Sequence, residues 1–320
     1  MTSPSLALRL RYLRKRFRRR NRVERRDPRV ARVVPRFARV TTVARGFGFT
    51  EGPVWMPEGH LLFSDIRHGV ARKWEPRDGS VTTIAEGSNG LTLDGRGRLT
   101  VCEPYNRRVT RVDDGTVVTL AEHYDGRRLN SPNDLVYRSD GALYFTDPPH
   151  GLPLLDDDPA KELAVNGVYL VRDGALQLAA DDMTRPNGLA LSPDERHLYV
   201  ANSDPDAKLW MKYDVRADGT LSNGRVLLDL TDERGQAPDG MKVDREGRLY
   251  CTGPGGLWIL TPDGDVLGRI KMRPEPSNCA WGDDAGATLY LTCVDRVCRI
   301  TMKVPGIRPP LPAPTAASTV

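Results

Sequence analysis

The chain has 320 residues, including 30 Gly and 25 Pro, and a formal net charge of +5. This length allows one large β domain or two ordinary domains and can bury a sizeable core. Residues 1–50 carry 16 Lys and Arg against two acidic residues, whereas the rest of the chain carries 31 basic and 40 acidic residues. The basicity therefore belongs to an N-terminal arm, which excludes a surface that is basic throughout.

The arm, to which we assign residues 1–36, contains the arginine-rich run LRLRYLRKRFRRRNRVERR between Leu8 and Arg26. Such runs occur in disordered extensions and in segments that contact nucleic acid or anionic membranes. We expect a disordered extension, with contact to nucleic acid or an anionic surface as the alternative. No apolar stretch of signal-peptide or membrane-span length follows the arginines. We therefore expect a soluble, cytoplasmic protein.

Residues 37–303 contain six copies of one sequence motif. Each copy has a polar residue, a short alternating run, an Asp/Gly turn and a second strand-like run, as in NDLVYRSDGALYFTD and NGLALSPDERHLYVAN. The intervals between copies are 38, 44, 54, 52 and 39 residues. The polar residues that begin the copies are Glu51, Asn89, Asn133, Asn187, Asp239 and Asn278.

The repeats predict the fold class. Two-residue alternation between Gly/Asp turns indicates antiparallel hairpins, and four-stranded units at intervals of 40–50 residues are typical of propeller blades. We predict an all-β, six-bladed β-propeller over residues 37–303. The strand-like segment Phe37–Gly46 is placed to complete the last blade, and residues 304–320 form a Pro-rich, flexible tail.

The six polar residues predict a site on the propeller axis, because the innermost strand of every blade lines the central channel. The ring contains two carboxylates and four amides, whose oxygens suit a hard cation such as Ca²⁺, Mg²⁺ or Mn²⁺. The competing interpretation is that Asn and Asp before Gly simply form turns. Glu51 favours the channel site, because Glu is a poor turn former.

Other residue types predict no rival catalytic centre. The five cysteines form no Cys-x-x-Cys pair and are expected to be buried free thiols. The five histidines show no metal-binding spacing, and no Gly-x-Ser-x-Gly segment is present. We expect the tryptophans to pack between blades; they are Trp55, Trp74, Trp210, Trp258 and Trp281.

Four segments carry a family resemblance: EGPVW (51–55), NSPNDLVYRSDGALYFTDPPHG (130–151), RPNGL (185–189) and PDGM (238–241). They resemble the SMP-30/gluconolactonase/LRE-like family, in particular its bacterial gluconolactonase branch, and the similarity extends over about residues 37–303. The resemblance implies a six-bladed propeller that holds one divalent metal in its channel and hydrolyses sugar lactones.

By the same resemblance, Glu51, Asn187 and Asp239 are metal ligands, and Asn133 is either a fourth ligand or a substrate contact. Asp239 would also be the general base and acid. Further candidate substrate contacts are Asn89, Arg128, which lies near a predicted strand end, and His150, which replaces a tyrosine of some relatives.

The implied cofactor is one divalent ion, with Ca²⁺ favoured and Mn²⁺, Mg²⁺ or Zn²⁺ as alternatives. It would polarise the carbonyl of a gluconolactone-like substrate while Asp239 moves the proton. Two alternatives stay open. The same site would act on another ester, a phosphotriester or a natural-product lactone, or the chain would be a non-catalytic propeller that binds a partner.

Overall fold

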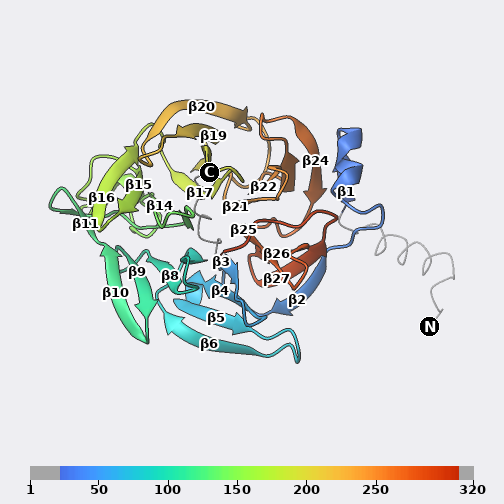
Figure 1. The fold of residues 1–320 in the computed structure, drawn as a ribbon, viewed down its shortest axis with the longest axis horizontal. Coiled ribbons are helices and arrows are strands. Elements are labelled where there is room, and N and C mark those ends of the chain that lie inside the picture. Colours follow the sequence, from blue (N-terminus) through green and yellow to red (C-terminus); the bar gives the residue numbers. More distant parts are fainter. Residues whose placement is uncertain (1–21, 310–320) are drawn as a thin grey trace, which may run out of the picture.

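A computed structural model describes residues 22–309, and it confirms the six-bladed β-propeller (Figure 1). Each blade is one antiparallel sheet, and its strands lie side by side in order from the propeller axis to the outer edge. Within residues 22–309, no helix is long and apolar enough to cross a membrane. The arginine-rich run, for which we expect a disordered extension with surface contact as the alternative, lies mainly in residues 1–21, outside the described residues.

The first three blades follow chain order. Blade 1 contains β3 (Thr50–Trp55), β4 (Leu61–Asp65), β5 (Val70–Trp74) and β6 (Val81–Glu86). Blade 2 contains β7 (Leu91–Leu93), β8 (Leu99–Glu103), β9 (Arg108–Asp113) and β10 (Thr116–Ala121). Blade 3 contains β13 (Leu135–Tyr137), β14 (Leu143–Asp147), β15 (Gly167–Arg172) and β16 (Ala175–Ala180).

The last three blades include both strands from the N-terminal part of the chain. Blade 4 contains β17 (Pro186–Leu191), β18 (His197–Asp204), β19 (Ala207–Val215) and β20 (Leu221–Asp229). Blade 5 contains β21 (Met241–Val243), β22 (Leu249–Gly253), β23 (Gly256–Leu260), β24 (Val266–Lys271) and β1 (Arg22–Arg25). Blade 6 contains β25 (Asn278–Gly282), β26 (Thr288–Cys293), β27 (Arg296–Thr301) and β2 (Thr41–Arg45).

Short elements fill the connections between the blades. A small hairpin pairs β11 (His123–Tyr124) with β12 (Arg127–Arg128). The 3₁₀ helices are η1 (Pro28–Arg32), η2 (Ile66–His68) and η3 (Leu155–Asp157).

Ring closure follows the prediction from the sequence. Strand β2 pairs antiparallel with β27, with Thr41 opposite Arg299, so an N-terminal strand completes the C-terminal blade. The inner strands contact one another in turn around the axis, and β25 contacts β3. This arrangement ties the two ends of the propeller together through backbone hydrogen bonds.

The ordered fold begins before residue 37, the boundary expected from the sequence. Strand β1 pairs with β24, with Arg22 opposite Lys271, and the Glu24 carboxylate lies 2.8 Å from Lys271 Nζ. Val30, Val33 and Val34 follow and are almost fully buried. The arginines masked this i, i+3, i+4 apolar pattern, which anchors residues 22–36 beside blade 5. At the other end, Gly306 forms a bridge with Asp244, so residues 304–309 also pack on the propeller.

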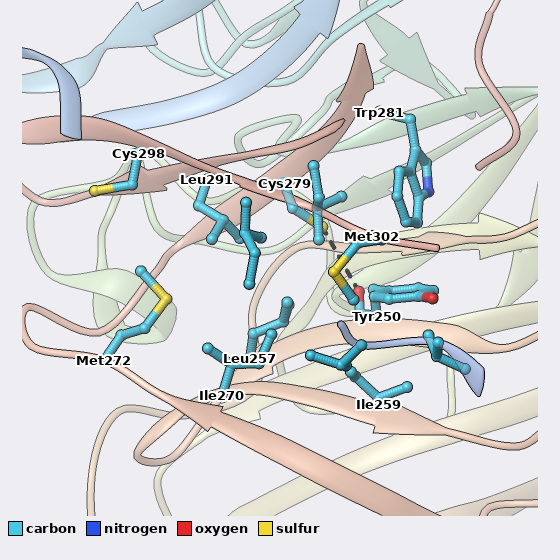
Figure 2. Close-up of a cluster of buried hydrophobic side chains, with 14 of the residues drawn as sticks. Tyr250, Leu257, Ile259, Ile270, Met272, Cys279, Trp281, Leu291, Cys298 and Met302 are labelled. Atoms are coloured by element: carbon cyan, nitrogen blue, oxygen red, sulfur yellow. Dashed lines mark hydrogen bonds between the residues drawn. The ribbon is translucent and has the colours of Figure 1, made fainter. Parts of the chain in front are cut away.

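Six apolar clusters form the core, one between each pair of neighbouring blades. Figure 2 shows the cluster between blades 5 and 6, where Tyr250 and Leu257 pack with Cys279 and Leu291. All five tryptophans belong to these clusters, as expected. The five cysteines are free and buried, as also expected. Because a lone sheet could cover neither of its faces, burial between blades holds the inner strands around the axis.

Candidate active site

Five of the six repeat residues meet at one end of the channel. Their side chains line a cavity of about 390 Å³. Glu51 lies in β3 and Asn187 in β17, while the other three lie just before the inner strands of their blades. The repeat residues that line the cavity are Glu51, Asn89, Asn133, Asn187 and Asp239.

The glycine that follows most of these residues allows the blades to approach one another. A Cβ on Gly52 would lie 1.9 Å from the Asn89 carbonyl oxygen, and one on Gly188 would lie 2.4 Å from that of Asp239. Real Cβ atoms do not tolerate such distances, so only glycine fits where inner strands converge. Turn formation alone therefore does not account for these glycines, because the residues lead into inner strands that approach one another closely.

The sixth repeat residue, Asn278, is buried behind the cavity and does not line it. The sequence predicted that its amide would offer an oxygen to a cation, but the amide is used for hydrogen bonds within the protein. Its Nδ2 donates to Glu51 Oε2 at 3.1 Å and to Asp134 Oδ2 at 3.3 Å. Its Oδ1 accepts from the backbone N–H of Cys279 at 2.8 Å. Asn278 thus holds Glu51 in place and directs no free oxygen at the cavity.

Asp134 is a third buried carboxylate that the sequence analysis missed. It is 3% exposed, and its Oδ1 accepts from the Leu135 N–H at 2.8 Å. The signal was present in the repeat, because Asp134 occupies the position that is glycine in four of the other five copies. The channel therefore contains more negative charge than the ring of repeat residues alone suggests.

The channel environment raises the pKa values of both ring carboxylates. Burial raises the pKa of Glu51 to about 7, although hydrogen bonds from Gly52 and Asn278 act in the opposite direction. Burial, followed by repulsion from Glu51 and Asp134, raises the pKa of Asp239 well above its ordinary value. Part of the Asp239 surface stays open to the cavity. These carboxylates carry negative charge at high cost, so a bound cation would stabilise their ionised forms.

The donor set is compatible with a hard divalent cation. Glu51 and Asp239 supply carboxylate oxygens, and Asn133 and Asn187 supply amide oxygens at the same cavity. Within the described part of the chain, no group of three or more His, Cys, Asp or Glu side chains forms a metal cluster. The predicted set differs from such clusters because half of its ligands are amides.

The cavity mouth has one apolar side and one polar side. Phe49, Ile66 and Tyr105 contribute apolar surface. On the polar side, His150 Nε2 lies 2.9 Å from Ser203 Oγ. Surrounding protein atoms, and then Arg185, lower the pKa of His150, although the residue is exposed at the mouth. His150 is therefore a neutral hydrogen-bonding group at pH 7.

Arg128 is the one candidate that lies outside the cavity lining. Its Nη2 donates to the Asn106 carbonyl at 2.9 Å, and its backbone N–H donates to Glu162. The strand end on which the prediction relied belongs to the β11–β12 hairpin, where the guanidinium serves local packing. Sequence spacing could not reveal this, because the hairpin lies outside the blade repeat.

Comparisons with known proteins identify the family of this chain. The model of the SMP-30/Gluconolactonase/LRE-like region matches residues 49–295. The chain belongs to this family. The resemblance of its motifs to the SMP-30/gluconolactonase/LRE-like family is thereby confirmed.

Two proteins similar to this chain are named gluconolactonases. A gluconolactonase of Zymomonas mobilis is 38% identical over 295 residues, which span 83% of this chain and 82% of the relative. The structure of a gluconolactonase from Xanthomonas campestris has 34% identity and a TM-score of 0.78, covering 88% of this chain and 94% of that chain.

A more distant structure shares the propeller fold. It is the calcium-binding regucalcin of Agrobacterium tumefaciens, with 18% identity and a TM-score of 0.71. The alignment covers 84% of this chain and 96% of that chain. At 18% identity, the similarity between this chain and regucalcin shows a shared fold and nothing more.

Proposed function

We propose that the chain hydrolyses a sugar lactone of the gluconolactone type to the open hydroxy acid, in the cavity on the propeller axis. The observation that carries the proposal is the convergence of Glu51, Asn89, Asn133, Asn187 and Asp239 at one cavity. The 38% identity with a gluconolactonase over most of both chains supports the same reaction. An aldonolactone, with its ring, carbonyl and hydroxyl groups, fits within the cavity of about 390 Å³.

Four residues would hold one divalent cation in this proposal, namely Glu51, Asn133, Asn187 and Asp239. Two carboxylates match the charge of a divalent ion, and the amide oxygens add ligands without adding charge. Ca²⁺ is the favoured ion, because an all-oxygen donor set suits it better than Zn²⁺. When bound, the cation would polarise the lactone carbonyl and stabilise the negative charge that develops on it.

The side chains around the cavity have distinct roles in ester cleavage. Asp239 accepts a proton from the attacking water as the new carbon–oxygen bond forms. It returns the proton to the ring oxygen when the lactone carbon–oxygen bond breaks. Asn89 lies where its amide can donate to substrate oxygens, and His150 with Ser203 offers hydrogen bonds to sugar hydroxyls at the mouth.

The decisive experiment measures lactone opening by purified protein. We expect glucono-1,5-lactone or a related aldonolactone to be hydrolysed, with activity lost after EDTA treatment and recovered with Ca²⁺ or Mn²⁺. The double variant Glu51→Gln, Asp239→Asn should be inactive. A matched double variant at exposed positions, Glu58→Gln with Asp173→Asn, should retain activity.

The alternatives give different results in the same experiment. Hydrolysis restricted to other esters or phosphotriesters would keep the site and change the substrate class. Full lactone turnover by the Glu51→Gln, Asp239→Asn variant would refute the proposed site. Absence of turnover on every ester with every divalent ion would favour a binding module.

A further inference from the structure

The end of the channel opposite the candidate active site has its own ring of side chains. These residues lie three positions after each repeat residue, and all line a second cavity of about 100 Å³. Ile307 also contributes to its wall. The ring consists of Val54, Thr92, Val136, Ala190, Lys242 and Trp281. Lys242 is its one charged member, in a position where the other blades have uncharged side chains.

The Lys242 ammonium points back toward the candidate active site. Its Nζ donates to the Met241 carbonyl at 2.9 Å and lies 4.0 Å from Asp134 Oδ2. The Lys242 side chain is 23% exposed and that of Asp134 is 4% exposed. A charge pair with so little water around it interacts more strongly than one on the surface.

The contacts continue from this pair to the ring of repeat residues. Asp134 Oδ2 accepts from Asn278 Nδ2, and the same Nδ2 donates to Glu51 Oε2. Lys242, Asp134, Asn278 and Glu51 thus form one continuous set of polar contacts along the axis. A change of charge at Lys242 therefore acts on Glu51 through two intervening side chains.

The formal charges of the side chains explain why the Lys242 ammonium lies next to Asp134. The contacting set together with Asp239 contains three carboxylates, those of Glu51, Asp134 and Asp239, and one ammonium, that of Lys242. Glu195 also lines the second cavity, but its carboxylate accepts from Ser139 and lies outside this set. The charges of the set sum to −2 when all are ionised, which one divalent cation neutralises. Without Lys242 the sum is −3, so a divalent ion would leave a buried negative charge uncompensated.

We propose that Lys242 is a positioning residue that acts from the opposite end of the channel, compensating Asp134 so that the site matches a divalent cation. This inference rests on the proposed function, because it assumes that the channel binds such an ion. Asp134 is the partner of Lys242 in this role and is not itself a ligand. The pair sets the affinity for the ion and the orientation of Asn278 toward Glu51.

The test is the affinity of EDTA-treated protein for Ca²⁺, measured by calorimetry at fixed pH and ionic strength. Lys242→Met removes the charge and keeps the length of the side chain, so Ca²⁺ should bind about tenfold more tightly because an uncompensated carboxylate adds attraction. Asp134→Asn should weaken binding by about the same factor. The double variant should bind Ca²⁺ with nearly the affinity of the unaltered protein. Lys242→Arg, which keeps the charge, should also bind Ca²⁺ as the unaltered protein does.

Lys212→Met is the matched control, because Lys212 is also largely buried and donates to a backbone carbonyl, but lies outside both cavities. It should leave the Ca²⁺ affinity unchanged. If Asp134→Asn does not fold, the comparison of Lys242→Met with Lys242→Arg decides the matter. Equal affinities of these two variants would overturn the inference, as would a double variant that binds Ca²⁺ as tightly as Lys242→Met does.

The two levels of proposal fail in different ways. If the unaltered protein takes up no divalent ion, the proposed metal site is wrong, and the inference falls with it. If the unaltered protein binds Ca²⁺ and turns over a lactone while Lys242→Met leaves the affinity unchanged, only the inference about Lys242 is wrong.

Discussion

Replacing Glu51 by Gln is expected to stabilise the cation-free protein above pH 7 while removing its stabilisation by Ca²⁺. Glu51 is 6% exposed, and its pKa rises from 4.5 to about 7, chiefly because of burial. At about 1.4 kcal/mol per pKa unit, the ionised side chain costs the folded protein about 3 kcal/mol at pH 8. Gln retains an oxygen that accepts from the Gly52 N–H and the Asn278 amide, so the substitution removes mainly the charge.

The pH dependence follows from the direction of the shift. Because the pKa of Glu51 is higher in the folded protein, the folded state retains a proton that the unfolded state loses between about pH 4.5 and 7. This contribution to stability is fully present below pH 4.5 and is lost as the pH rises through 7. The variant has no such proton, so its advantage grows from about zero at pH 4.5 to about 3 kcal/mol at pH 8.

Urea and thermal unfolding of EDTA-treated protein between pH 4.5 and 8 measure this difference. At about 2 °C per kcal/mol for a chain of this size, the variant should melt about 6 °C higher at pH 8. Ca²⁺ at one hundred times its Kd should add about 2.7 kcal/mol to the unaltered protein, but far less to the variant. Glu58→Gln, at an exposed position, is the control. A stability difference that does not change with pH would refute the reasoning.

Three further substitutions test the site and its support. Asp239→Asn should lower kcat by about 10²–10⁴ with an unchanged circular dichroism spectrum, because it removes the proton acceptor; turnover within a few-fold of the unaltered protein would contradict that role. Gly240→Ala would place a Cβ 2.0 Å from Asn278 Cγ, so urea unfolding should show a loss of about 1–3 kcal/mol. Gly95→Ala, where a Cβ meets nothing within 4 Å, should change stability by less than about 0.5 kcal/mol. His150→Phe should raise KM for a polyhydroxylated lactone more than for an unsubstituted one in steady-state kinetics, and equal increases would argue against hydrogen bonding at the mouth.

The repeat made the architecture predictable. Six copies at similar intervals imply six equivalent sheets, and equivalent positions in such sheets fall on a ring around the axis. The prediction that Glu51 and Asp239 approach each other follows from this symmetry, although 187 residues separate them in the sequence. The same reasoning placed Asn133 and Asn187 at the shared cavity without knowledge of any contact.

Contacts that break the symmetry could not be predicted from the repeat. Asn278 occupies the same register as Asn89, yet its amide donates inward to two carboxylates rather than lining the cavity. Its orientation depends on Asp134, which belongs to a different blade. Arg128 lies outside the cavity lining for a related reason, because it belongs to a hairpin in the connection between blades 2 and 3. Pairings between blades are a property of the folded ring, and spacing along one chain does not encode them.

The N-terminal boundary was missed because charge obscured a short apolar pattern. Val30, Val33 and Val34 lie among arginines, and a window dominated by charge predicts disorder. Three valines suffice here because the adjacent β1 already pairs with the edge of blade 5 and reduces the entropy lost on packing. An arginine-rich segment can therefore begin a domain when a sheet edge is available to pair with it.

The inner strands of the channel explain why one sequence repeat can specify both the propeller fold and the residues of the site. Moving inward along each inner strand, a polar residue comes first, then usually a glycine, and two positions later a side chain that is uncharged in five of six blades. The glycines allow six strands to converge, as the 2.5 Å between a Cβ on Gly90 and the Asn133 carbonyl oxygen illustrates. This convergence brings five of the six polar residues to one cavity, and the ring three positions further on lies behind them. Asp134 and Lys242 are the two charged exceptions to this pattern and lie within 4.0 Å of each other, which is expected if a charge introduced at one level of the channel must be balanced at the next.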